Sequence, residues 1–290
     1  MSARMKRKEP PGRATRRVLR VHLNKALAGL RNPEQPEAIH KVRREIKMLR
    51  AILRLVRTAV GRKKYRTMAA ALRLAPRPLA AQRDARVISR AFETLVQPAA
   101  GPFRTLRRQL LAASLQAKHK SRDFDSASVT SDLLRKVRSE LLSLRLKRLK
   151  WRELRQGLEA SHGRGREAFQ EATRAPTTES LHQWRKRVKD LGCQLDFLSN
   201  AWPAKTRARL VALEQLGEKL GEEHDLALLE KCMYERCESG PETIRVQELV
   251  QTRRRQLRAS LRRLGARLYT APASAVGDQV EADWKRWRES

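Results

Sequence analysis

The sequence is poor in acidic and aromatic residues, and each shortage narrows what the protein can bind. It has 31 Asp and Glu against 65 Lys and Arg, which gives a formal net charge of +34. So large an excess of positive charge requires a polyanionic partner or many counterions. Because only 4% of the residues are aromatic, few side chains can stack on single-stranded bases. The composition therefore favours a ligand that is recognised by its negative charges.

Cysteine and long apolar runs are also scarce. Cys193, Cys232 and Cys237 form a scattered set without paired CxxC spacing, which argues against a disulfide framework and a zinc site. We expect a protein of the reducing cytoplasm that needs no metal and no cofactor. No apolar run approaches the roughly 20 residues that span a bilayer, and Pro10-Pro11-Gly12 would interrupt an amphipathic transit peptide. Neither secretion nor membrane insertion is expected.

The residues that are abundant favour helices. Leu, Ala, Arg, Glu and Lys recur throughout the chain, and 40% of residues are hydrophobic, enough for a buried core. An all-α fold is therefore predicted. Periodicity and the positions of proline place a flexible basic tail at residues 1–12, followed by helices over residues 13–30, 37–57, 62–75, 79–97, 102–118, 132–158, 178–199, 204–236, 242–268 and 275–288, with a weaker helix reaching residue 173.

The chain is expected to divide into two halves. Residues 118–131 read KHKSRDFDSASVTS and show the clearest loss of helical periodicity. We therefore predict one domain over residues 13–288, with a first half at 13–120, a linker at 121–131 and a second half at 132–288.

An internal repeat supports this division. A histidine-headed basic motif occurs twice, 142 residues apart, as His40-x-x-Arg43-Arg44-x-x-Lys47 and His182-x-x-Arg185-Lys186-x-x-Lys189. The flanking apolar positions also correspond, with Ile39, Val42, Ile46, Leu49 and Leu53 matching Leu181, Trp184, Val188, Leu191 and Leu195. About forty residues after each histidine, Arg83-Asp84 and His224-Asp225 form a second matching pair. Two matches at nearly the same offset indicate a duplication.

The repeated motif produces a long basic stripe. In the first half its members share an arc of roughly 120° on one helix, beside the apolar arc: His40, Arg43, Arg44, Lys47, Arg50 and Arg54. At about 1.5 Å per residue the stripe is some 21 Å long, too extended for a single phosphate. The first helix repeats the spacing with Arg13, Arg16, Arg17 and Arg20. Arg164 and Arg166, beside His162, are further candidates, although Gly163 and Gly165 make that stretch a poor helix.

These motifs resemble those of the CHAD family, the histidine-bearing α-helical domains. The similar segments are AIHKVRREIKMLRAIL and AAQRDARV in the first half and LHQWRKRVKDL and LGEEHDLALL in the second. The resemblance implies two four-helix bundles related by a pseudo-two-fold, a basic central channel that binds inorganic polyphosphate, and no reaction. It assigns phosphate contacts to His40, Arg43, Arg44, Lys47, His182, Arg185, Lys186 and Lys189, and the surface extends to Arg50, Arg54 and the first-helix arginines. Ala80, where the second half has Gly221, and the acidic Glu45 depart from the pattern.

The predicted ligand suits these side chains. An arginine fork can hold two phosphate oxygens, a lysine acts as a point charge, and both release counterions when a polyanion binds. Affinity should therefore fall steeply as salt increases. The sequence leaves open the preferred chain length, the oligomeric state, the protonation of His40 and His182, and association with polyphosphate granules.

Three other functions compete with this interpretation. A phosphate-chain-processing enzyme would need a GxxxxGK[ST] loop or clustered carboxylates for magnesium, and neither is found. Asp84 and Asp225 are interpreted as structural, and Glu222 and Glu223 point in different directions on a helix. A nucleic-acid-binding helical protein would also use the +34 charge, without reading sequence and with weak affinity. A purely structural scaffold is the third alternative.

Overall fold

The structure, a computed structural model, describes residues 3–32, 37–97, 103–122, 126–198 and 203–289. Side chains are described for all of these except residues 80–85, 114–122 and 204. The described residues form helices and connecting turns, which confirms the predicted all-α fold. No helix in these ranges combines the length and apolarity that crossing a membrane requires.

Most predicted helices lie within a few residues of their observed positions. The helices are α1 (Pro11–Gly29), α2 (Ala38–Leu55), α3 (Arg57–Val60), α4 (Arg62–Leu74), α5 (Ala80–Val96), α6 (Arg104–Arg122), α7 (Ser126–Leu142), α8 (Trp151–Arg174), α9 (Thr178–Leu198), α10 (Ala204–Arg236), α11 (Pro241–Leu268) and α12 (Ala273–Glu289). Proline begins α1 and α11, where its missing N–H costs no helical hydrogen bond.

Two details of the predicted helices are wrong. The continuous helix over residues 132–158 is instead α7 and α8, joined by a non-helical segment in which Leu144, Leu146 and Leu149 are buried. Without glycine or proline, that break had no local signal, because tertiary burial decides it. Conversely, Gly163 and Gly165 do not interrupt α8, which continues through both to Arg174.

The apolar core does not divide at the boundary between sequence halves. One cluster joins α1, α2, α4 and α7 to α8, α9, α12 and the first part of α10. A second cluster joins α5 and α6 to the last part of α10 and the first part of α11. Thus α5 and α6, from the first half, pack on second-half helices, while α7 packs on α1 and α4. Residues 126–131, expected as linker, are the beginning of α7.

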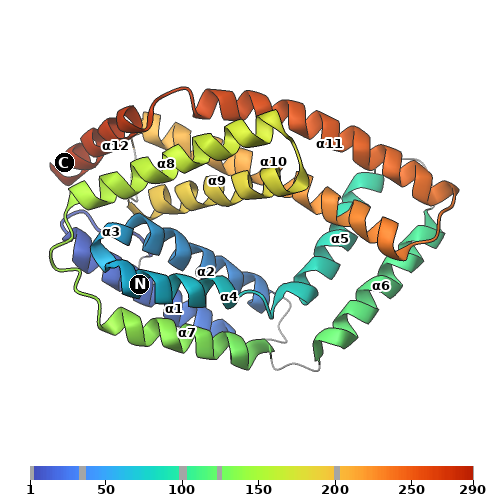
Figure 1. Cartoon of the computed structure of the whole chain (residues 1–290), viewed down its shortest axis with the longest axis horizontal. Helices are drawn as coiled ribbons and strands as arrows, with labels where there is room; N and C mark the ends of the chain where they lie inside the picture. The colour runs from blue at the N-terminus through green and yellow to red at the C-terminus, as the bar shows by residue number, and fades with distance from the viewer. Residues whose placement is uncertain (1–2, 33–36, 98–102, 123–125, 199–202, 290) are drawn as a thin grey trace.

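Helices α2 and α9, which carry the two histidine motifs, lie side by side near the middle of the molecule (Figure 1). Both predicted apolar sets are buried, since no member exceeds 8% exposure. At this contact the Gln194 side-chain amide donates to the Ala51 carbonyl at 3.0 Å. The duplicated helices therefore meet in the core with their basic residues at its edge.

Glycine permits one close helix crossing. A Cβ on Gly157 of α8 would lie 1.9 Å from the carbonyl oxygen of Leu55, at the end of α2. By contrast, a Cβ on Gly163, two turns along α8, would meet nothing within 4 Å. The first glycine is required for packing, and the second is not.

Gly157→Ala is expected to lower the free energy of unfolding by about 1–3 kcal/mol or more, because backbone must move to admit the methyl group. Gly163→Ala should raise it by roughly 0.5–1 kcal/mol, because alanine favours a helix and has room here. Urea titrations followed by circular dichroism measure both changes. Equal effects of the two substitutions would contradict the close crossing.

Candidate phosphate-binding site

The α2 stripe projects from the core as the sequence predicted. His40, Arg44 and Lys47 are exposed, whereas Arg43, Arg50 and Arg54 are half-buried. Arg43 donates from Nη1 to the carbonyl oxygen of Pro76 at 2.6 Å, which ties the guanidinium to the turn between α4 and α5. The stripe thus has exposed cations at its beginning and anchored arginines along one side.

The one acidic residue within the α2 stripe turns away from it. Glu45 is 5% exposed, and its Oε2 accepts a hydrogen bond from Nδ1 of His22 on α1 at 2.6 Å. Burial by itself raises the pKa of Glu45, but the His22 hydrogen bond and the charges of His22, Lys25 and Arg44 outweigh it and hold the pKa below its ordinary value. Glu45 therefore fixes α1 to α2, and its Oε1 also lies 3.6 Å from Nη2 of the exposed Arg44.

On α9, the motif side chains lie across α10. The rings of His182 and His224 stack, with centroids 4.7 Å apart and an interplanar angle of 28°. A Cβ on Gly217 would lie 2.9 Å from the Lys189 ammonium nitrogen, and one on Gly221 would lie 3.4 Å from Nη2 of Arg185. The two glycines, four residues apart on α10, thus leave room for the cationic side chains of α9.

The two halves meet in a cluster of charge that we call the junction cluster, made of Arg50, Arg54, Arg164, Arg187 and Asp190. Arg54 of α2 pairs with Asp190 of α9, and Arg187 lies 3.9 Å from the same carboxylate. Burial raises the pKa of Asp190 above its ordinary value, and the charges of the four arginines oppose that rise. One carboxylate therefore lies within electrostatic range of four guanidinium groups.

Cations from both motifs approach one another beside this cluster. Burial raises the pKa of the Cys193 thiol to about 12, and both Lys189 and Lys47 are close enough to oppose that rise. The pKa of Lys186 is lowered by burial and also by the charges of Arg50 and Arg187. Cations of α2 therefore lie within electrostatic range of cations of α9, and an anion bound between them would relieve their mutual repulsion.

Comparison with known proteins identifies this architecture. The family model described as "CHAD domain" matches residues 15–234, most of the chain. The chain belongs to the CHAD family. The solved CHAD domain from the plant Ricinus communis is 19% identical, with a TM-score of 0.58 over 96% of this chain and 94% of that one. A structure titled "PptA from Streptomyces chartreusis" is 16% identical, with a TM-score of 0.65 over 91% of this chain and all of that one. No curated protein matches.

The other predicted cations of this CHAD domain lie in different surroundings. Arg16 donates to the carbonyl of Leu144, and Arg17 pairs with Glu9 at 2.7 Å, so their described contacts are with neighbouring loops. Arg13 and Arg20 are exposed on α1. Arg164 belongs to the junction cluster, and its Nη2 donates to the Ser161 hydroxyl at 3.0 Å.

Arg166 lies on the opposite side of α8, near His162. His162 is fully buried against Tyr269, with ring centroids 5.3 Å apart. Burial, reinforced by the charges of Arg209 and Arg166, lowers the pKa of His162 to about 4. His162 is therefore a neutral packing residue at neutral pH.

Glu222 and Glu223 of α10 face α11, a helix that begins after residue 234, where the matched family region ends. Glu223 is 1% exposed, and its Oε1 accepts from Nη2 of Arg254 at 2.9 Å and from Nη2 of Arg258 at 3.1 Å. Glu222 pairs with Arg253 at 2.6 Å. These contacts give both carboxylates a role in packing α10 on α11. The side chains of Arg83 and Asp84 lie outside the part of the structure that is described.

Three residues of the site were not predicted from the sequence: Asp190, Arg187 and Gly217. Asp190 follows the second motif directly, but only tertiary structure brings Arg54 and Arg164 to it. Gly217 did have a signal, since Gly217, Gly221 and His224 fall on one face of a helix at i, i+4 and i+7. Small residues on the face that meets a basic helix indicate that long side chains lie over them.

Stability should depend on pH through Glu45. Because its folded pKa lies below the unfolded value, the ionised carboxylate adds stability that is fully present above the unfolded pKa and is lost as pH falls through the folded pKa. Glu45→Gln should therefore cost about 1–3 kcal/mol at pH 7 and less at pH 3, as measured by urea unfolding at both pH values. The exposed Glu167→Gln is the control. A gap between Glu45→Gln and wild type that stays constant with pH would contradict the role of this carboxylate.

Proposed function

We propose that this CHAD domain binds inorganic polyphosphate on the basic surface of α2 and α9, and that it does so without chemical transformation of the ligand. The observation that carries the proposal is that α2 and α9, which carry the two motifs, pack side by side, with Lys47 and Lys189 both acting on Cys193 and Arg50 acting on Lys186. Each helix contributes cations over several turns, which suits a polymer with a negative charge on every unit.

The sorting of acidic residues supports this assignment. Glu45 bonds to His22 of α1, and its Oε1 also lies 3.6 Å from Nη2 of Arg44, while Glu222 and Glu223 pair with arginines of α11. Asp190 holds Arg54 at the end of the α2 stripe. Lys47 and Arg44 are exposed, so a ligand can reach both side chains from solvent.

The proposed chemistry is binding alone. Arginine forks would each hold two phosphate oxygens, and the lysines would act as point charges. His182 and His224, stacked at the edge of the surface, would contribute ring N–H donors. We further propose that the protein is cytoplasmic and that this domain directs it to polyphosphate granules.

Non-specific nucleic-acid binding is the second candidate, and the net charge of +34 favours it. DNA and RNA present phosphates at fixed helical spacing or along strands that carry bases. A flexible phosphate chain without bases can follow the surface more closely, so the two ligands should differ in their tolerance of salt.

Arg43→Gln combined with Arg185→Gln should weaken binding of long-chain polyphosphate by at least tenfold. Loss of two charge-assisted contacts should also reduce the slope of log affinity against log salt by about 1.5. Isothermal titration across a salt series measures both quantities. Lys136→Gln with Arg138→Gln, two exposed cations of α7, removes the same charge elsewhere and is the control. If both double variants behave alike while folded, the α2 and α9 surface is not the binding site.

A further inference from the structure

Helix α4 carries a basic stripe of its own that the duplicated motif does not include. Arg62, Arg66 and Arg73 are exposed and lie on one face, with Tyr65 and Ala69 between them. From Arg62 to Arg73 this stripe extends about 16 Å at 1.5 Å per residue. It is long enough to contact several phosphate groups.

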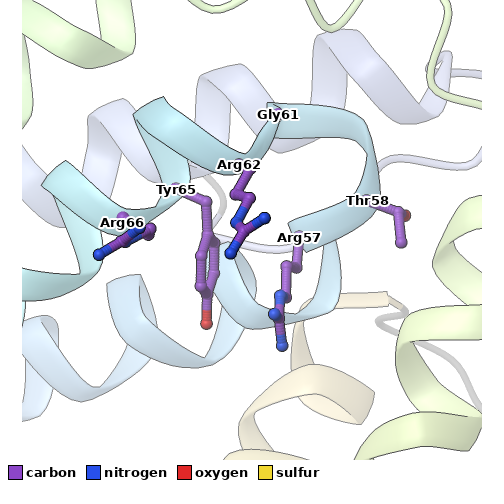
Figure 2. A pocket seen from close by; sticks show the side chains of 6 residues that line it. All are labelled: Arg57, Thr58, Gly61, Arg62, Tyr65 and Arg66. Carbon is purple, nitrogen blue, oxygen red and sulfur yellow. The ribbon is translucent and has the colours of Figure 1, made fainter.

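Two open pockets border this stripe. The first, of about 500 Å³, lies between α3 and α4 and is shown in Figure 2. The second, of about 390 Å³, lies between α2 and α4. Both are lined by Tyr65 and Arg66, so they adjoin. Their combined lining includes six arginines and no carboxylate: Arg50, Arg54, Arg57, Arg62, Arg66 and Arg73.

No described carboxylate pairs with the outer arginines of these pockets. Among the described residues, no ion pair involves Arg57, Arg62, Arg66 or Arg73. Arg57 instead lies over the ring of Tyr65, 5.2 Å from its centroid. Holding so many guanidinium groups together without a carboxylate is unfavourable unless an anion joins them.

The pockets continue the α2 surface. Arg50 and Arg54, at the end of the α2 stripe, line the second pocket. Tyr65 is close enough to Arg50 of α2 and to Arg164 of α8 to influence the pKa of each. A polyanion that follows α2 to its end therefore reaches the α4 arginines without a gap in positive charge.

We propose that five residues of α3 and α4 form a second phosphate-binding site, which we call the α4 face: Arg57, Arg62, Tyr65, Arg66 and Arg73. This site would bind the continuation of the same phosphate chain beyond the junction cluster. This inference rests on the proposed function and extends it to a ligand path that turns from α2 onto α4. The guanidinium groups would hold phosphate oxygens, and the Tyr65 hydroxyl would donate a hydrogen bond.

The surroundings of Tyr65 favour a phosphate chain over nucleic acid. Figure 2 shows the ring with Arg66 on one side and Arg62 and Arg57 on the other. Because the Arg57 guanidinium lies over the ring, one face of Tyr65 is not open for a base to stack on. The arginines around the ring suit contacts with phosphate oxygens.

The test compares Arg62→Gln, Arg66→Gln and Arg73→Gln in one chain with Arg255→Gln, Arg262→Gln and Arg263→Gln in another. The second set removes the same charge from exposed positions on α11, which runs along the upper edge of the molecule in Figure 1, away from α4. Long-chain polyphosphate and duplex DNA are titrated calorimetrically across a salt series, with circular dichroism to verify folding. Arg66→Glu alone provides a milder variant should the triple substitution unfold.

The α4 variant is expected to cover fewer phosphate units per protein than wild type and to lose about two to three units of salt slope for polyphosphate, while the α11 control loses less than one. An α4 variant that matches the control in both quantities would overturn the proposal of a second phosphate-binding site. So would a variant that loses DNA binding alone. Failure of wild type itself to bind polyphosphate would instead overturn the proposed function, so the two failures are distinguishable.

Discussion

The fold depends on holding two positively charged helices side by side against their mutual repulsion. Helices α2 and α9 contact each other through buried apolar faces, and a hydrogen bond from Gln194 to the backbone of α2 fixes their positions. At one end of the contact Asp190 supplies negative charge to Arg54 and its neighbours. Lys47 of α2 and Lys189 of α9 both act on the buried Cys193 thiol, as do the carboxylates of Asp190 and Asp196. Hydrophobic burial offsets this repulsion during folding, and the repulsion that remains favours capture of an anion.

Three acidic side chains join pairs of helices. Glu45 joins α1 to α2, Glu223 joins α10 to α11, and Arg155 of α8 is held by Glu281 of α12. Glu45 and Glu223 are buried, so removing the cationic partner of either would leave an uncompensated charge, and these pairs help to specify which helices pack together. Many other carboxylates are exposed, among them Glu37, Asp132 and Asp278.

Much of this arrangement could be predicted from the sequence, for identifiable reasons. Helical periodicity and proline positions are local signals, and they located most helices and both buried apolar sets. The break before α8 was missed because it depends on burial of Leu144 and Leu146 rather than on a turn-forming residue. The exchange of α5, α6 and α7 between halves was missed because repeats reveal equivalence and not packing partners. Within the site, the motif residues were visible as a repeat, whereas Asp190, Gly217 and Tyr65 acquire their significance only when separate helices meet.

The basic surface of α2 and α9 is proposed to prefer a phosphate chain over other polyanions of similar charge. Calorimetric titration of long-chain polyphosphate, duplex DNA and RNA, matched in phosphate concentration and compared across one salt series at fixed pH, tests it most directly. Polyphosphate binding is expected to survive at salt concentrations that abolish binding of both nucleic acids, because a flexible phosphate chain can contact α2 and α9 together. Equal decay of all three affinities with salt would contradict it and leave only non-specific polyanion binding.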